Sequence, residues 1–255
     1  MNYSKWFSLD GRIALVTGAG RGLGRSYARA LAEAGATVVC VGRNTAGLKD
    51  IAGEISSAGG RAEVLAADVS KPREVRAVID ETVERYGRLD VLVNNAGMEI
   101  AKDFLEVTEE DYDTIMGVNL RGLYFAAQAA ARHMVRQHSG KIINIGSLAS
   151  QIGIAKSTVY SASKGGVLLF TRALAVELAS HNIQVNAIGP GYFRTDMTEP
   201  FFQDPEHRSW IEQRIPMGRI GTLEDLAATV VFLAGPGSDY ITGQIIYVDG
   251  GWLAS

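Results

Sequence analysis

The sequence of 255 residues is poor in cysteine and has no excess of basic charge. Cys40 is the single cysteine, so no disulfide can form within the chain. It lies in the apolar run Val38-Val39-Cys40-Val41, which indicates a packed strand residue rather than a reactive thiol. The formal net charge of −3 argues against a general nucleic-acid binder, because such proteins carry a basic excess or a basic face. We therefore expect a small-molecule substrate and no nucleic-acid partner.

Long apolar runs and linker-like stretches are also missing. Residues 1–6 lack the apolar core of a signal peptide, and no run approaches the length needed to span a bilayer. We therefore expect a cytoplasmic protein with no membrane partner. Without a linker, repeat or low-complexity tract, one domain over residues 1–255 is the simpler expectation. No metal is expected, since the histidines form no ligand-spaced cluster; they are His133, His138, His181 and His207.

Short runs rich in Val and Ile alternate with longer helical patterns, which is typical of repeated βαβ units and a parallel sheet. Strands are predicted near residues 12–17, 36–42, 62–67, 89–94, 140–146, 183–188 and 244–248. Helices are predicted near residues 23–34, 45–58, 72–86, 109–137, 158–180 and 223–234. The predicted fold class is α/β, a doubly wound, mainly parallel, seven-stranded Rossmann sheet with helices on both faces.

The alternation of predicted strands and helices is interrupted at residues 191–221. Their prolines are scattered among aromatic and charged residues, and the segment follows directly on Pro190-Gly191 at a predicted strand end. Long irregular segments within compact domains are usually functional. We interpret residues 191–221 as a substrate lid containing one or two short helices; the alternative is a surface excursion without a role.

The first predicted strand leads into a glycine-rich turn and then a helix. Glycines there permit a tight turn and close backbone approach, so that a pyrophosphate can meet the helix N-terminus. The spacing differs from G-x-G-x-x-G, but the order of strand, turn and helix predicts a dinucleotide site. The predicted contacts in this turn are Gly18, Arg21, Gly22, Leu23 and Gly24.

The end of the second strand bears on the choice of dinucleotide. NAD-binding folds commonly place an acid there for the ribose 2′-hydroxyl, whereas arginine accommodates a 2′-phosphate. This chain has Gly42-Arg43-Asn44, and Arg21 can reach the same phosphate. NADP is therefore preferred, with NAD as the alternative if both guanidinium groups are merely solvated. Further contacts are predicted where the third and fourth strands end, at Asp68, Val69, Asn95, Ala96 and Gly97.

Tyr160 and Lys164 lie four residues apart on a predicted helix and therefore share one face. A phenol with a pKa near 10 is a poor proton carrier at neutral pH, but an adjacent ammonium would favour the phenolate. Ser147 ends a strand and would hold the substrate oxygen against Tyr160. The pattern predicts hydride transfer between a nicotinamide and a carbonyl or secondary alcohol; a pair on a solvated helix face is the alternative.

Asn119 lies within a predicted helix, where asparagine is a mediocre helix former. A locally unfavourable polar residue suggests a function. An ordinary interhelical hydrogen bond is the alternative explanation.

With these motifs, the chain resembles the short-chain dehydrogenase/reductase family over essentially its whole length. The matching positions are Thr17-Gly18-x-x-x-Gly22-x-Gly24, Asp68, Asn94-Asn95-Ala96-Gly97, Asn119, Ser147, Tyr160-x-x-x-Lys164, Pro190-Gly191 and Thr195. The resemblance implies a catalytic tetrad of Asn119, Ser147, Tyr160 and Lys164, with Asn119 holding a water that links Lys164 to a proton relay. It also implies cofactor contacts from Tyr160, Lys164, Pro190, Gly191 and Thr195, with Lys164 on the nicotinamide ribose and Thr195 on the carboxamide.

Members of this family commonly form tetramers through two long helices and the C-terminal strand. The corresponding segments near 109–137 and 158–180 contain more Ala, Leu and Val than one sheet face needs. A homotetramer is therefore expected, with a dimer as the alternative.

Within the family, residues 41–44, 190–198 and 248–254 most resemble gluconate 5-dehydrogenases and related sugar-acid dehydrogenases. Those enzymes often carry basic residues after Asn-Asn-Ala-Gly, whereas this chain has Met98-Glu99-Ile100. Glu99 would repel an anion, while Lys156 and Arg194 would supply a positive clamp. A sugar, polyol or sugar acid is the predicted substrate, with contacts from Glu99, Ser147, Gln151, Lys156, Tyr192 and Arg194.

Two other functions stay open at this point. Reduction of a 3-oxoacyl thioester on acyl carrier protein would need a basic docking surface, for which the candidates are His133, Arg136, His138 and Lys141. A non-catalytic cofactor sensor or scaffold is a third possibility, and the intact tetrad argues against it.

Overall fold

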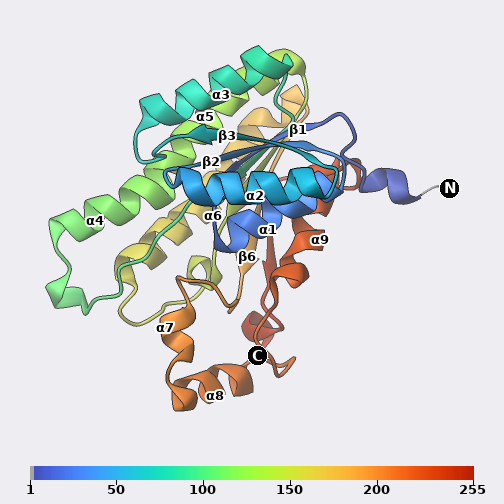
Figure 1. Ribbon diagram of the computed structural model, residues 1–255. Coiled ribbons are helices and arrows are strands. Elements are labelled where there is room, and N and C mark those ends of the chain that lie inside the picture. The colour runs from blue at the N-terminus through green and yellow to red at the C-terminus, as the bar shows by residue number, and fades with distance from the viewer. Residues whose placement is uncertain (1–2) are drawn as a thin grey trace.

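The computed structural model describes residues 3–255, which build a seven-stranded sheet in the order β3-β2-β1-β4-β5-β6-β7. All neighbouring strands in this order pair in parallel, so the sheet is wholly rather than mainly parallel. Helices cover both faces (Figure 1), and the predicted Rossmann class is confirmed. The strands are β1 Ile13–Thr17, β2 Thr37–Gly42, β3 Arg61–Ala66, β4 Val91–Asn94, β5 Gly140–Ile145, β6 Ile183–Pro190 and β7 Ile245–Val248.

The helices follow the predicted pattern with one exception. The segment predicted as one helix over 109–137 is divided by η3 (Gly117–Gly122), a π-helical stretch between α4 (Glu109–Met116) and α5 (Leu123–Gln137). The remaining α-helices are α1 Gly22–Glu33, α2 Thr45–Ser57, α3 Pro72–Tyr86, α6 Thr158–Leu178, α7 Glu199–Phe202, α8 Pro205–Arg214 and α9 Leu223–Ala234. No helix within residues 3–255 is long and apolar enough to cross a membrane.

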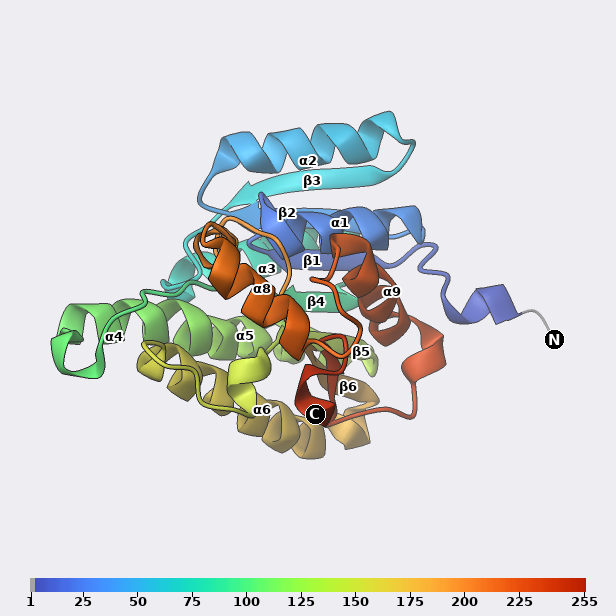
Figure 2. The same cartoon turned by 90° about the horizontal axis from the view of Figure 1, so that it is seen from below.

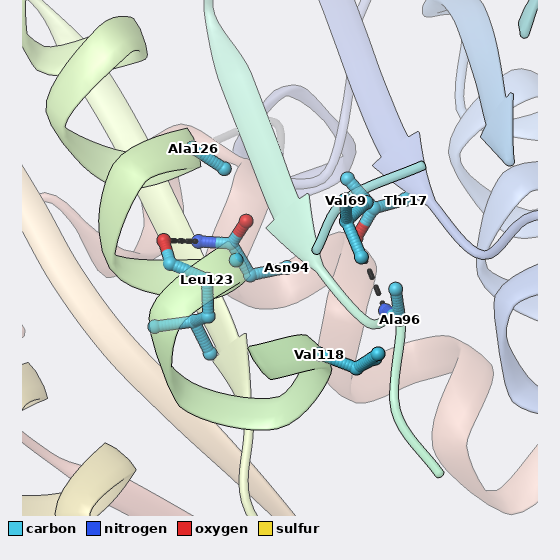
Figure 3. Close-up of a pocket in the computed structure, with 8 residues that line it drawn as sticks. Thr17, Val69, Asn94, Ala96, Val118, Leu123 and Ala126 are labelled. Atoms are coloured by element: carbon cyan, nitrogen blue, oxygen red, sulfur yellow. Dashed lines mark hydrogen bonds between the residues drawn. The ribbon is translucent and has the colours of Figure 1, made fainter. Parts of the chain in front are cut away.

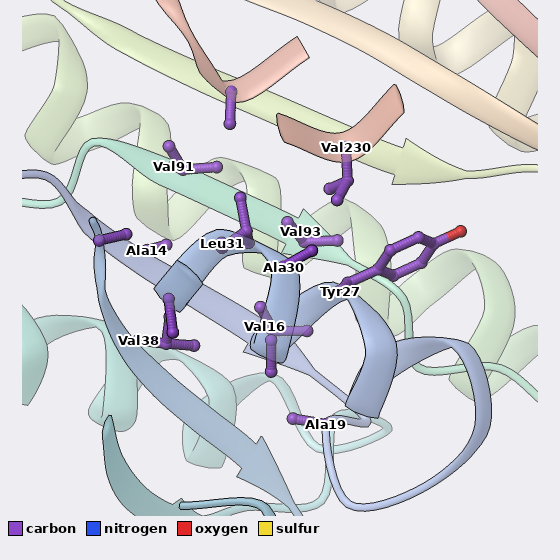
Figure 4. Close-up of a cluster of buried hydrophobic side chains, with 14 of the residues drawn as sticks. Ala14, Val16, Ala19, Tyr27, Ala30, Leu31, Val38, Val91, Val93 and Val230 are labelled. Carbon is purple, nitrogen blue, oxygen red and sulfur yellow. The ribbon is translucent and has the colours of Figure 1, made fainter. Parts of the chain in front are cut away.

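Strand alternation divides the core between the two faces of the sheet. In β1, Ala14 and Val16 point toward α1, α2 and α9, whereas Ile13 and Leu15 point toward α3, α5 and α6. Figure 4 shows the first face, where Tyr27 lies with the aliphatic side chains. Because both faces are covered, the strands are almost continuously apolar, and Cys40 in β2 is fully buried, as predicted. Burial raises the pKa of the Cys40 thiol to about 12.

The direction of winding reverses between β1 and β4. Helices α1 and α2 carry the chain outward from β1 to β3, and α3 returns it to β4 on the other side of β1. Figure 2 shows this strand order from β3 to β6. In parallel sheets, ligands bind beyond the carboxyl ends of the strands at such a reversal. The topology thus places the candidate site where β1 and β4 end.

Residues 191–221 contain two short helices, α7 and α8, beside the C-terminal segment (Figure 1), where one or two were predicted. Their apolar side chains pack against Leu148 and Trp252. Leu148 directly follows Ser147, so this segment stands next to the carboxyl end of β5. Its role as a lid remains a prediction.

A buried carboxylate ties the beginning of β1 to the beginning of β4. Asp90 is 2% exposed and accepts hydrogen bonds from the Ile13 amide at 2.9 Å and from Arg12 Nη1 at 2.9 Å. Arg88 Nε donates to both carboxylate oxygens, at 3.0 and 2.9 Å. The carboxylate of Asp90 therefore joins the beginnings of β1 and β4, the central strand pair.

We expect Asp90→Ala to lower the free energy of unfolding by about 2–3 kcal/mol, because the buried Ile13 amide loses its acceptor and two arginines lose a charged one. Asp90→Asn should cost less, since its carboxamide oxygen can still accept from Ile13. Urea denaturation measures both, with Asp50→Ala on the exposed surface of α2 as the control. Equal stability of Asp90→Ala and the control would contradict this account.

Candidate active site

The structure brings Ser147 close enough to Tyr160, at the carboxyl end of β5, for the serine hydroxyl to lower the pKa of the phenol. Ser147 also caps the short 3₁₀ helix η4 (Leu148–Ser150), where its Oγ accepts from the Ala149 amide at 3.2 Å. Tyr160 lies in the first turn of α6. Local capping therefore fixes the serine rotamer, while the start of α6 presents the phenol to it.

Lys164 is buried one turn further along α6. Its Nζ donates to the Ile145 carbonyl at 2.7 Å and lies 5.6 Å from the Tyr160 ring centroid. Burial lowers the pKa of Lys164 to about 8. Burial raises the pKa of Tyr160 to about 12, against the Ser147 hydrogen bond, and the charge of Glu99 adds to the rise.

From the sequence, the Lys164 ammonium was predicted to lower the pKa of Tyr160. In the structure the pKa of Tyr160 is raised by burial, and Lys164 has no effect on it. The two residues share a helix face, but the long lysine side chain is directed to the main chain of β5 instead of the phenolic oxygen. Tyr160 thus carries its proton at neutral pH in the free protein, and its raised pKa makes it a weaker acid than an exposed phenol.

Asn119 lies in the π-helical stretch η3 and is fully buried. Its Oδ1 accepts from the Met98 amide at 2.8 Å, and its Nδ2 donates to the Met98 carbonyl at 2.9 Å and to Ser163 Oγ at 3.2 Å. The bond to α6 is the interhelical hydrogen bond considered as the alternative. A Cβ on Gly97 would lie 3.5 Å from Asn119 Oδ1 and 3.7 Å from Lys164 Nζ, so these residues converge at the β4 end. Single π turns are frequent at functional sites.

Two serines that the sequence did not single out hold this arrangement. Ser163 Oγ donates to the Tyr160 carbonyl at 2.7 Å and contacts Asn119. Ser150 Oγ donates to the Lys164 carbonyl at 2.9 Å and accepts from the Ser147 amide at 3.2 Å. No spacing pattern distinguishes them from other serines, because their partners come from separate elements.

The glycine turn leads into α1 at the reversal of the sheet. Gly18 and Gly22 have φ values of +67° and +52°, and a Cβ on Gly24 would lie only 2.2 Å from the Gly18 carbonyl oxygen. Arg21, the N-cap residue, makes no side-chain cap. The first amides of α1 thus have no side-chain cap and lie at the positive end of the helix dipole, which fits a pyrophosphate.

Hydrogen bonds fasten this turn to the end of β4. Thr17 Oγ1 accepts from the amides of Asn95 and Ala96 at 3.0 and 3.1 Å, and Asn95 Nδ2 donates to the Thr17 carbonyl at 2.9 Å. Figure 3 shows a pocket at this junction, with Val69 and Ala96 on its wall. Asn95 therefore supports the glycine turn with its side chain, and the pocket includes two predicted cofactor residues.

The predicted phosphate-binding side chains lie near the carboxyl ends of β1 and β2. Arg43 is largely exposed, with Nη1 3.9 Å from Asp68 Oδ2. Arg21 Nη1 lies 3.6 Å from Asp196 Oδ2, and both side chains are exposed. Asn44 instead caps α2, accepting from the Ala46 and Gly47 amides at 3.2 and 3.4 Å. Each arginine has a carboxylate nearby with which a bound anion would compete, whereas the asparagine side chain is engaged in the cap.

Thr195 comes to the glycine turn from far along the chain. A Cβ on Gly22 would lie 3.6 Å from Thr195 Cβ, and the Thr195 amide donates to Thr198 Oγ1 at 3.0 Å. Pro190 ends β6, and the amide of Gly191 donates to Val248 at 2.9 Å. Residues predicted to line the nicotinamide thus lie opposite the start of α1.

The predicted substrate residues divide into two groups. Glu99 and Tyr192 lie in the site: Glu99 accepts from Ser157 Oγ, and its charge raises the pKa of Tyr160 and Tyr192 after the larger effect of burial. Gln151 is exposed beyond η4.

The two predicted clamp cations each have a carboxylate partner nearby. Lys156 Nζ lies 3.5 Å from Asp103 Oδ2, and Arg194 Nε lies 3.0 Å from Glu199 Oε2. Both cations therefore face a carboxylate at the surface, Lys156 one from a distant segment and Arg194 one from the next turn, and their role as a clamp stays a prediction.

Comparisons with known proteins place the chain among oxidoreductases. The family model described as enoyl-(acyl carrier protein) reductase matches residues 18–253. The chain is 44% identical to 2-dehydro-3-deoxy-D-gluconate 5-dehydrogenase of Escherichia coli over 249 residues, which cover 97% of this chain and 98% of that protein. It is 38% identical to 3-oxoacyl-(acyl-carrier-protein) reductase of Thermotoga maritima over 244 residues, covering 95% and 98%.

A solved structure is also similar to this chain, and it too is an oxidoreductase. Gluconate 5-dehydrogenase of Burkholderia cenocepacia, crystallised with NADP and tartrate, superposes with a TM-score of 0.96 at 39% identity and covers 99% of both chains. Together with the serine, tyrosine and lysine gathered at the end of β5, these matches show that the chain belongs to the short-chain dehydrogenase/reductase family.

Proposed function

We propose that the protein is an NADP-dependent oxidoreductase that interconverts a secondary alcohol and a carbonyl on a sugar acid, as in gluconate 5-dehydrogenase. The observation that carries this proposal is the contact between Ser147 and Tyr160, with Lys164 buried beside them, at the end of β5. This site lies next to a helix N-terminus without a side-chain cap, at the reversal of a parallel sheet. Relatives named for sugar acids support the substrate class.

The glycine turn fits the dinucleotide in its backbone and its charge. Gly18, Gly22 and the amides at the start of α1 would hold the pyrophosphate. Arg43 and Arg21 would hold the 2′-phosphate of NADP, since no acid occupies the end of β2. NAD remains the second candidate cofactor. The nicotinamide, when bound, supplies or accepts the hydride.

The remaining chemistry is proton transfer by the chain's own residues. In reduction, the protonated Tyr160 gives its proton to the oxygen of the substrate, which Ser147 holds by a hydrogen bond. In oxidation, the phenolate takes the alcohol proton back. Lys164 ties the start of α6 to β5 through the Ile145 carbonyl, and Asn119 keeps the β4 loop and α6 in place around Tyr160.

We also propose that residues 1–255 work as one domain, with residues 191–221 as the substrate lid. The packing of α7 and α8 against Leu148, next to Ser147, supports the lid. A homotetramer is proposed as well. Apolar side chains exposed on α5 and α6 support such an interface, namely Tyr124, Leu169 and Val176.

Reduction of 3-oxoacyl thioesters is the second candidate, supported by the identity to the Thermotoga maritima enzyme. The surface proposed for an acidic carrier is weakened by pairing. His133 Nε2 lies 2.6 Å from Asp80 Oδ1, and Lys141 Nζ lies 2.7 Å from Asp239 Oδ1. Sugar-acid chemistry is therefore the stronger proposal.

The proton-donor assignment is tested by Tyr160→Phe, which removes only the hydroxyl. We expect turnover of gluconate or its 5-keto form to fall by roughly a hundred- to ten-thousandfold. Binding of NADPH, followed by fluorescence, should be nearly unchanged. Full activity of the variant would show that another group carries the proton.

The pH dependence is tested by Glu99→Gln. Alcohol oxidation needs a deprotonated Tyr160, so its kcat/KM should rise with pH. Since the charge of Glu99 raises the pKa of Tyr160, its removal should move the rising limb to lower pH. Ser157→Ala is the matched control, because it removes the hydrogen bond to Glu99 and keeps the charge. A profile that does not move would contradict the electrostatic coupling.

The cofactor assignment is tested by Arg43→Ala. Loss of a charge-assisted hydrogen bond should weaken NADPH binding by about 10- to 100-fold. NADH binding should change little, because NADH has no 2′-phosphate. Arg29→Ala, on the exposed surface of α1, is the control. Equal losses for NADH and NADPH would overturn the role of Arg43.

A further inference from the structure

Arg214, the last residue of α8, has an unusual environment among the arginines of residues 191–221. The other three lie near carboxylates: Arg194 pairs with Glu199 at 3.0 Å, Arg208 with Glu212 at 3.0 Å and Arg219 with Asp225 at 2.6 Å. In the part of the chain that the structure describes, Arg214 has no carboxylate oxygen within 4.0 Å.

Two tryptophans hold the Arg214 guanidinium instead. Its central carbon lies 5.0 Å from the ring centroid of Trp252 and 5.8 Å from that of Trp210. The two rings meet edge to face at 5.9 Å. Stacking of this kind restricts the side chain and leaves the N–H groups at the rim of the guanidinium for another acceptor. The arginine is therefore both oriented and uncompensated by an acid.

The same tryptophan connects Arg214 to the candidate active site. Trp252 packs 4.9 Å from Tyr192 and belongs to one apolar cluster with Leu148, the residue after Ser147. Burial raises the pKa of Tyr192, the charge of Glu99 adds to the rise, and the charge of Arg214 opposes it. Tyr192 thus lies within reach of both the negative charge of Glu99 and the positive charge of Arg214.

These contacts place an acidic side chain, Glu99, near the reacting residues and a basic side chain, Arg214, on α8. Ser147 and Tyr160 stand at the reacting end, Glu99 acts on both Tyr160 and Tyr192, and Arg214 acts on Tyr192 from the lid. A substrate that matches this order has hydroxyl groups near the reacting carbon, where Glu99 can accept their hydrogen bonds. Its anionic group lies at the other end.

We propose that Arg214 binds the carboxylate of the sugar acid, at the end of the substrate remote from the carbon that exchanges the hydride. This inference rests on the proposed function and specifies its substrate recognition. A planar guanidinium presents paired N–H groups that match a carboxylate, and its prior orientation by Trp210 and Trp252 lowers the entropy cost of binding. Recognition by Arg214 would also allow a site containing Glu99 to accept an acid, because the guanidinium supplies the opposite charge for the carboxylate.

The test compares gluconate with gluconamide, which has the same carbon chain and hydroxyl groups but no charge. We expect the wild-type enzyme to prefer gluconate in kcat/KM. Arg214→Gln should reduce that preference by about 10- to 100-fold, mainly through KM for gluconate, and should leave gluconamide turnover nearly unchanged. Arg214→Lys should restore part of the preference, and Arg208→Gln on the same helix should leave it intact.

The outcomes separate this inference from the proposed function. If the wild type oxidises gluconate and Arg214→Gln keeps the full preference over gluconamide, Arg214 does not bind the carboxylate. Equal loss with both substrates, accompanied by a lower melting temperature, would show that Arg214 only supports the packing of the tryptophans, which also overturns the inference. A wild type that turns over thioesters and no sugar acid would overturn the proposed function itself.

Discussion

The parallel pairing of β1 with β4 is the constraint on which the candidate site depends. These strands are distant in sequence, and their adjacency makes the sheet wind in opposite directions on either side. The glycine turn after β1 and the Asn-Asn-Ala-Gly segment after β4 therefore end at one place. Asp90 fixes the beginning of this pair, and Thr17 with Asn95 fixes its end. A phosphate site and a proton-transfer site can then share one edge of the sheet.

Burial governs the chemistry at that edge more than direct pairing does. Tyr160 and Lys164 both lose water around their charged forms, so the pKa of the phenol is raised and that of the ammonium is lowered. The serine hydroxyl and the Glu99 carboxylate act on Tyr160 as smaller, opposing effects. Because desolvation favours the neutral phenol, Tyr160 holds its proton in the free protein, and the stabilisation of the phenolate that donation needs must come from changes around the site.

Residues 191–221 show how aromatic packing and charge work together. Trp252 comes from the C-terminal segment and Trp210 from α8, yet they meet over one arginine and next to Tyr192. Three neighbouring arginines are neutralised by acids close in sequence, which is common for exposed ion pairs and contributes little energy. The distinction between these arginines arises only from the fold.

The sequence by itself determined the order of strands and helices, the fold class and the positions of the motif residues along the chain. Apolar runs located every strand, because those signals are local, whereas for residues 191–221 the sequence indicated only one or two short helices without their bounds. It placed Tyr160 and Lys164 on one face of α6, because helix geometry depends only on spacing. It missed the π-helical stretch at Asn119, since the hydrogen bonds that accompany it come from Met98 and Ser163.

Only the tertiary structure decided which groups meet. Lys164 turned toward Ile145, Lys156 and Arg194 were paired with acids, and Arg214, which no local motif marks, stands beside Tyr192. Spacing along a chain fixes the face on which a side chain lies, but the direction of a long, flexible side chain depends on partners contributed by distant elements. For that reason the sequence indicated Ser147, Tyr160 and Lys164 as neighbours, and it did not indicate that Arg214 lies near Tyr192.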